Sequence, residues 1–128
     1  MDLGKQNILF FTRTMMLGGT ENVVLQLCEV FKPKVNKIVV CSCGGVNVEK
    51  LTEMGIRHYQ IPDISSKKDM FKICRTVKKI VEKEQITVIH SHHRMAAFYT
   101  EILFGSSIIK IANAHNTFFD KKLLTRFA

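Results

Sequence analysis

Short apolar runs alternate along the chain with stretches in which apolar residues recur every three or four positions. The short runs are typical of buried strands, and the recurring pattern is typical of helices that pack on them. Strands are predicted at residues 7–12, 37–42, 57–61, 87–90 and 108–112. Because strand and helix alternate without interruption, the order predicts an α/β fold, an open parallel sheet of about five strands with helices on both faces.

The stretches between the runs predict the helices. Thr20 is expected to cap the first helix and Pro33 to end it, and Gly55 is a natural terminator for a short second helix. The longest helix spans 67–84, and another spans 95–104. The apolar stripe predicted for the longest helix is Met70, Phe71, Cys74, Val77 and Val81, with Ile73 and Ile80 beside it.

Length and composition indicate one soluble globular domain. The chain has 128 residues, of which 46% are hydrophobic and 23% charged. Its longest apolar runs have the length of strands, and its first residues lack the pattern of a signal peptide, so we expect a cytoplasmic protein. A further helix predicted from residue 121 stops at residue 128, which indicates a fragment.

The four cysteines fit the same compartment. Cys28 and Cys74 lie on apolar faces of predicted helices, and Cys41 and Cys43 alternate along a predicted strand. The Cys-x-Cys pair has no further ligands at metal spacing, so we expect free thiols and no metal site.

Charge widens the range of partners. Lys and Arg number 19 against 11 for Asp and Glu, a net charge of +8, which favours an acidic partner such as a phosphate, a nucleic acid or an anionic membrane. A nucleic-acid partner has little support, because no aromatic residues interleave with basic ones on a sheet face. The outer face of the longest helix carries four basic residues, which indicate either a solvated surface or a membrane contact: Lys68, Lys72, Arg75 and Lys79.

Candidate chemistry follows the strands, because ligands of open parallel sheets gather at the carboxyl ends of the strands. After the first strand come Gly18, Gly19 and Thr20, at the start of a helix. Glycines admit a ligand close to the backbone, and a helix N-terminus favours phosphate. The stretch matches neither a dinucleotide fingerprint nor a P-loop, and a plain turn capped by Thr20 is the alternative.

The fourth strand is followed by a histidine cluster. His90, His92, His93 and Arg94 are suited to binding an anion or a sugar hydroxyl, or to acid–base chemistry. In extended chain His90 and His92 share one face and His93 points to the other. We expect His90 to pack in the structure, whereas His92 and His93 can equally face a ligand.

A second polar cluster follows the fifth strand. Asn113, His115, Asn116 and Thr117 come directly after it. They are suited to holding a sugar or a phosphate, or they form a turn in which an asparagine bonds its own backbone.

Three segments in register resemble the N-terminal domain of family 4 glycosyltransferases, retaining enzymes with the GT-B fold. They are NILFFTRTMMLGGTENVVLQL, ITVIHSHHRMAAFYTEIL and IIKIANAHNTFFDKK, and together with their spacing they cover almost the whole chain. The resemblance implies that residues 1–128 form the acceptor-side, Rossmann-like half of such an enzyme. The second domain, with the paired glutamates that grip the nucleotide-sugar, is absent from these residues.

The resemblance also implies roles for the candidate residues. Gly18, Gly19 and Thr20 would approach the donor diphosphate, and His115 would lie near the transferred sugar and support departure of the diphosphate. The acceptor side would be lined by His92, His93, Arg94 and Asn116. The nucleotide-sugar is a co-substrate, and neither a metal nor another cofactor is expected.

The implied activity is transfer of a hexose-type sugar to a glycan or lipid-linked acceptor, in synthesis of cell-surface polysaccharide or glycolipid at the inner face of the cell membrane. This chain alone is expected to be inactive, because the groups that supply most of the donor affinity lie in the other domain. The alternative is a non-catalytic binding subunit completed by a separate donor-binding chain.

Overall fold

A five-stranded parallel sheet forms the centre of the computed structural model, which describes residues 2–16 and 18–112. The strands are β1 (Asn7–Phe11), β2 (Lys37–Ser42), β3 (Arg57–Gln60), β4 (Val88–Ser91) and β5 (Ile109–Ala112). Their order in the sheet is β3-β2-β1-β4-β5, and all four pairings are parallel. The predicted fold class is confirmed, with strand ends that differ from the prediction by one residue.

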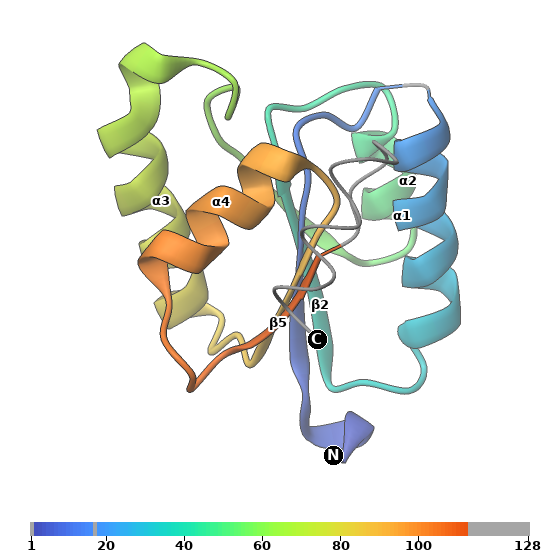
Figure 1. Ribbon diagram of the computed structural model, residues 1–128. Helices are drawn as coiled ribbons and strands as arrows, with labels where there is room; N and C mark the ends of the chain where they lie inside the picture. The colour runs from blue at the N-terminus through green and yellow to red at the C-terminus, as the bar shows by residue number, and fades with distance from the viewer. Residues whose placement is uncertain (1, 17, 113–128) are drawn as a thin grey trace.

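Helices cover both faces of this sheet. They are α1 (Gly19–Phe31), α2 (Val48–Glu53), α3 (Met70–Lys83) and α4 (Arg94–Leu103), with 3₁₀ turns η1 (Leu3–Lys5) and η2 (Lys67–Asp69). Figure 1 shows α1 and α2 on one side of the sheet and α3 and α4 on the other. Right-handed crossovers require this division, because the chain moves from β1 towards β3 in one direction and from β4 to β5 in the other.

The central strand β1 is apolar at consecutive positions because helices bury both of its faces. Ile8 and Phe10 belong to the core beneath α1 and α2, and Leu9 and Phe11 belong to the core beneath α3 and α4. The order of strands reverses between β1 and β4, so the chain leaves these two neighbours towards opposite faces. Ligands of such folds bind outside the carboxyl edge of the sheet at this switch point.

Two helix predictions are wrong in detail. The N-cap of α1 is Gly18, whose carbonyl accepts from Asn22 N at 3.1 Å, and Thr20 lies inside the helix instead of capping it. Phe71 is 84% exposed and lies outside the apolar stripe of α3. The core-facing positions of this helix start from Ile73, and a residue two positions earlier points to the opposite side, because each residue turns the helix by about 100°.

A buried carboxylate joins the helix layer to the opposite, amino-terminal edge of the sheet. Glu84 follows α3, is 4% exposed, and pairs with Lys37 Nζ at 3.1 Å and with Arg57 Nη1 at 2.8 Å. The hydroxyl of Tyr59 donates to the same carboxylate. Burial raises the pKa of Glu84, but hydrogen bonds from Tyr59, Lys37 and Arg57 outweigh it and lower the pKa to about 2.

We expect Glu84→Gln to lower the free energy of unfolding at pH 7 by about 3 kcal/mol, because the folded-state pKa lies below the unfolded value of about 4.5. A depressed carboxyl pKa stabilises the fold above pH 4.5, and the contribution is lost as the pH falls towards 2. The difference between Glu84→Gln and wild type should therefore shrink to about 1 kcal/mol at pH 3. Urea unfolding at several pH values measures it.

Glu82→Gln is the matched control for this experiment, because Glu82 is an exposed carboxylate in the last turn of α3, two residues before Glu84. Its unfolding free energy should stay within about 0.5 kcal/mol of wild type. A difference for Glu84→Gln that stays constant from pH 7 to pH 3 would contradict the ionic role of Glu84.

Candidate functional site

The glycine turn after β1 lies at the carboxyl edge of the sheet, at the start of α1. Gly18 and Gly19 are exposed, and Thr20 is half-buried in the first turn. A Cβ atom at Gly19 would have no atom within 4 Å, so packing does not require glycine there. The space beside Gly19 at the start of α1 is therefore open, and a helix N-terminus favours an anion.

The segment that leads to this turn is held by the loop after β2. Met15 N donates to Gly44 O at 3.0 Å, and Asn47 N donates to Met15 O at 2.8 Å. The buried side chain of Asn47 adds a bond from Nδ2 to Met16 O at 3.0 Å. The backbone of Met15 and Met16 is thus held in place by the loop after β2.

Gly45 permits this contact between the two loops. Its φ is +150°, and an added Cβ would lie 2.4 Å from the backbone of Met15 and Met16. No side chain fits at that distance, so packing requires glycine at position 45. Packing does not require glycine at position 19.

His93 links the end of β4 to the start of α4. It is the N-cap of α4, and its Nδ1 accepts from Met95 N at 3.1 Å. Burial lowers the pKa of His93, and the positive charges of Arg13 and Arg94 lower it further. A neutral imidazole whose Nδ1 accepts a bond carries its proton on Nε2, so His93 offers an N–H donor.

His90 and His92 share one face of β4, as the extended chain predicts. Their ring centroids are 4.2 Å apart, and both rings pack on Phe10. Burial lowers the pKa of His90 to about 4. His92 is 1% exposed, and this corrects the expectation that its ring faces an acceptor.

An ion pair at the same edge was not identified from the sequence. Arg13, two residues after β1, donates from Nε and Nη2 to the two carboxylate oxygens of Asp63, both at 2.9 Å. The bond from Arg13 is the largest cause that lowers the pKa of Asp63 to about 2, and Ser65 N also donates to this carboxylate, at 2.9 Å. Opposite charges shortly after β1 and β3, two strands separated in the sheet only by β2, were the signal that could have found this pair.

Of the remaining predicted site residues, one lies at the start of α4 and the others lie outside the described residues. Arg94 is the exposed first residue of α4 and contributes to the positive field around His93. His115 and Asn116, with Asn113 beside them, lie outside the described residues. The glycine turn, His93 and Arg94 therefore all follow the carboxyl ends of the neighbouring strands β1 and β4.

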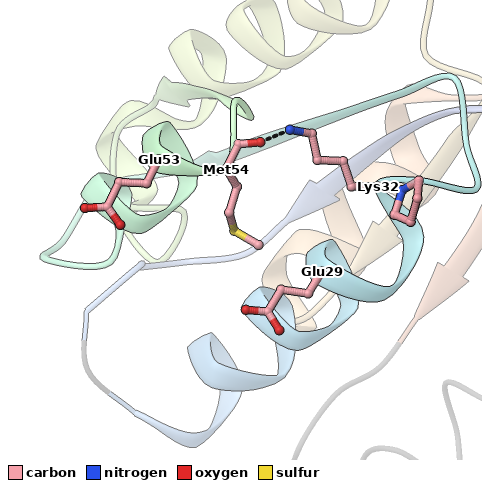
Figure 2. Close-up of a pocket in the computed structure, with 5 residues that line it drawn as sticks. Glu29, Lys32, Glu53 and Met54 are labelled. Atoms are coloured by element: carbon pink, nitrogen blue, oxygen red, sulfur yellow. Dashed lines mark hydrogen bonds between the residues drawn. The ribbon is translucent and has the colours of Figure 1, made fainter.

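Two hollows lie away from this edge. Figure 2 shows one between α1 and α2, with Glu29, Glu53 and Met54 on its walls, where Lys32 donates to the carbonyl of Met54. This bond places a cation at the C-terminus of α2, a structural role that the helix dipole favours. The other hollow is mostly apolar, with Gln6 and His90 as the polar residues of its lining; the apolar lining residues are Leu3, Ile8, Phe10, Phe31, Val88 and Ile111.

The cysteines are free thiols, as expected. Cys28 and Cys41 are buried, and Cys43 and Cys74 are partly exposed. Burial raises the pKa of Cys28 to about 12, so this thiol is inert at neutral pH. Within residues 2–16 and 18–112, no three His, Cys, Asp or Glu side chains are grouped so that they could hold a metal ion.

The outer face of α3 and of the turn before it is basic. Lys68, Lys72, Arg75 and Lys79 are all exposed, and the exposed Phe71 lies among them by helical position. Among the helices that the structure describes, none has the length and apolar character needed to cross a membrane.

Comparison with known proteins gives the family. The sequence profile described as Glycosyltransferase Family 4 matches residues 17–128, so the chain belongs to that family. A search of curated proteins found no match. The fold is similar to a glycosyltransferase from Rickettsia africae ESF-5, with a TM-score of 0.66, 15% identity, and coverage of 84% of this chain and 29% of that chain.

A second similar structure is MurG from Acinetobacter baumannii, with a TM-score of 0.69 and 13% identity. The match covers 96% of this chain and 39% of MurG. The sheet is thus the Rossmann-like half of a GT-B fold, and the chain spans well under half the length of either structure.

We expect Gly45→Ala to destabilise the fold by about 2 kcal/mol or more, because its Cβ would collide with the Met15–Met16 backbone and its φ is unfavourable for alanine. Amide spectra should show the largest changes at Met15 and Met16, and urea unfolding gives the free energy. Gly105→Ala is the control, because a Cβ there meets no atom within 4 Å. Equal effects of the two substitutions would contradict the packing role of Gly45.

Proposed function

We propose that the chain is the acceptor-side domain of a glycosyltransferase, which moves a hexose-type sugar from a nucleotide-sugar to a glycan or lipid-linked acceptor. One observation carries the proposal beyond family membership. The exposed Gly18–Gly19 turn forms the N-terminus of α1 at the carboxyl edge of the sheet, and the loop after β2 holds the preceding residues Met15 and Met16. This is where an open α/β sheet binds a phosphate group.

In this proposal, the donor diphosphate approaches Gly18, Gly19 and Thr20. The first amide groups of α1 donate to its oxygens, and the helix dipole stabilises the negative charge that grows as the glycosidic bond to the diphosphate breaks. Glu21 already places a carboxylate at this helix end, where it accepts from Thr14 Oγ1 at 2.8 Å. The diphosphate must therefore bind at Gly19, where an added Cβ would meet no atom within 4 Å, because a Cβ at Gly18 would lie 3.1 Å from Glu21 Oε1.

The proposed acceptor side is formed by His93 and Arg94, with Asn116 assigned to it on the family resemblance alone. The Nε2–H group of His93 can donate to a sugar oxygen, and Arg94 supplies positive charge for an acidic group. His115 keeps its proposed place beside the transferred sugar, where it would hydrogen-bond the sugar. Retention of configuration and transfer without a metal belong to this proposal.

Turnover in this proposal requires a second domain that binds the nucleotide-sugar and closes over the site. Closure excludes water and aligns the reacting atoms, and a single open domain offers neither. The other candidate function, a binding subunit completed by a separate chain, would use the same edge of the sheet.

The test is an assay with labelled nucleotide-sugars and membrane extracts as a source of acceptors. We expect the 128-residue chain to give no transfer above background, and a polypeptide that adds a donor-binding domain to give transfer. Gly19→Ala should then raise the donor KM without destabilising the fold, because its Cβ enters only the space assigned to the diphosphate.

Two outcomes of this assay would contradict the proposal. Steady transfer by the 128-residue chain alone would show that no second domain is needed. A donor KM unchanged by Gly19→Ala would remove the glycine turn from the donor site. Gly105→Ala serves as the control for added bulk at an exposed glycine.

The basic face of α3 favours binding of the protein to an anionic membrane surface on the cytoplasmic side. Positive charge attracts anionic headgroups, and an aromatic ring among the charges adds an apolar anchor. Phe71 occupies that position, and its exposure is otherwise unexplained.

We expect the chain to co-sediment with phosphatidylglycerol vesicles at low salt and not with phosphatidylcholine vesicles. Each neutral substitution among Lys68, Lys72, Arg75 and Lys79 should weaken binding about fivefold, since one basic residue near the surface contributes about 1 kcal/mol. Phe71→Ala should weaken it further, and Phe98→Ala, which removes an exposed ring on α4, should not. Absence of binding at low salt would end the membrane hypothesis.

A further inference from the structure

The Arg13–Asp63 ion pair stands at the same edge of the sheet as the proposed site, without a role in the core. Both side chains are exposed to solvent, 45% for Arg13 and 38% for Asp63. Exposed ion pairs contribute little to stability, about 0–1 kcal/mol. Stability alone therefore does not account for a two-point pair between the loops after β1 and β3.

The geometry leaves part of this pair available for a ligand. Asp63 accepts three bonds, from Arg13 Nε, Arg13 Nη2 and Ser65 N. A carboxylate has about four acceptor positions, so one position remains on Oδ2 among the bonds made by the described residues. Arg13 uses two of its five N–H groups in the pair, so donors remain on the same guanidinium.

His93 lies within electrostatic range of both partners. The charge of Arg13 lowers the pKa of His93 and that of Asp63 raises it. Three loops, after β1, β3 and β4, thus bring a carboxylate acceptor, guanidinium donors and an imidazole N–H donor to one place. Neighbouring hydroxyl groups of a sugar each donate and accept a hydrogen bond. One carboxylate acceptor beside guanidinium and imidazole donors is therefore suited to binding such a pair of hydroxyl groups.

We propose that Asp63, oriented by Arg13, recognises the acceptor sugar by accepting a hydrogen bond from one of two neighbouring hydroxyl groups. Arg13 donates to the adjacent hydroxyl oxygen, and His93 Nε2–H donates to the same sugar. Asp63 is a specificity-determining residue in this assignment, and it takes no part in bond breaking. That the bound sugar is the acceptor rests on the proposed function. Binding of a sugar at Asp63 does not require turnover and can be tested separately.

A phosphate is the competing ligand for the same place, because Arg13 and Arg94 are cationic. The Asp63 carboxylate opposes it, since Asp63 already neutralises Arg13 at two points and would repel an anion. The structure therefore favours a neutral polyol over a phosphate at this pair.

The test is a titration of the isotope-labelled chain, in which the side-chain NMR signals of Arg13 Nε and His93 Nε2 are observed. The probes are the methyl glycosides of glucose, galactose, mannose and N-acetylglucosamine at millimolar concentrations, and inorganic phosphate in a parallel series. We expect at least one glycoside to shift both signals saturably. Asp63→Asn should weaken this binding at least about tenfold, the factor of one charge-assisted hydrogen bond.

Asparagine keeps an oxygen for the bond from Ser65 N, and thermal melting confirms that the variant is folded. Arg13→Lys is the second variant, which keeps the charge but loses the two-point contact, and it should weaken binding as well. Glu101→Gln is the matched control, because Glu101 is 41% exposed and pairs with Lys110 away from this site. Its affinity for the glycoside should equal that of wild type.

The assignment would be overturned if no glycoside shifts the two signals, if Asp63→Asn binds as tightly as wild type, or if only phosphate binds. These outcomes are separate from the transfer assay. If the sugar binds but the two-domain polypeptide gives no transfer, the proposed function is disproved and the sugar site at Asp63 is retained. If transfer occurs but Asp63→Asn binds the sugar as tightly as wild type, the proposed function is retained and the sugar site at Asp63 is disproved.

Discussion

The site depends on the close approach of two loops at the carboxyl edge of the sheet. The backbone at Met15 and Met16 lies against Gly45 at a distance that excludes any side chain, and the buried side chain of Asn47 fixes the same segment. Packing between the loops after β1 and β2 therefore holds Met15 and Met16, which precede the Gly18–Gly19 turn in the sequence.

Charged side chains have different roles at the two edges of the sheet. At the amino-terminal edge, the Glu84 carboxylate is buried, and cations and a hydroxyl surround it, so its charge contributes to stability. At the carboxyl edge, the Arg13–Asp63 pair is exposed and contributes little to stability, but it keeps polar groups oriented beside the switch point. Because the ion pairs of Glu84 lie at the opposite edge from Arg13 and Asp63, substitutions at the carboxyl edge can change ligand contacts without breaking the ion pairs that stabilise the fold.

Much of the fold follows from the sequence because its signals are local. The apolar run of β1 and the helical spacing of α3 depend on neighbours in the chain, and β1 was predicted within one residue and α3 within three, because the 3₁₀ turn η2 precedes the helix. Phe71 was misplaced because it follows Met70, and spacing alone does not say which of two adjacent apolar residues faces the sheet. Thr20 was misplaced because Gly18 could cap the helix with its backbone, without a side-chain bond.

The candidate site was harder to predict because it joins loops far apart in the sequence. Gly18 and Gly19 were identified because a helix follows them directly. The Arg13–Asp63 pair was missed because its partners are fifty positions apart, and only the strand order brings them together. The burial of His92 likewise depends on packing of its ring with Phe10 and His90, which periodicity along β4 does not reveal.

The most direct measurement is a titration of the ¹⁵N-labelled chain with pyrophosphate, followed through its backbone amides. A donor diphosphate site at the glycine turn predicts saturable shifts at Gly18, Gly19 and Thr20, and their loss in Gly19→Val, with small changes elsewhere. Shifts confined to the basic face of α3, or no saturable shift at the glycine turn, would contradict the assignment of this edge of the sheet as the donor side of a glycosyltransferase.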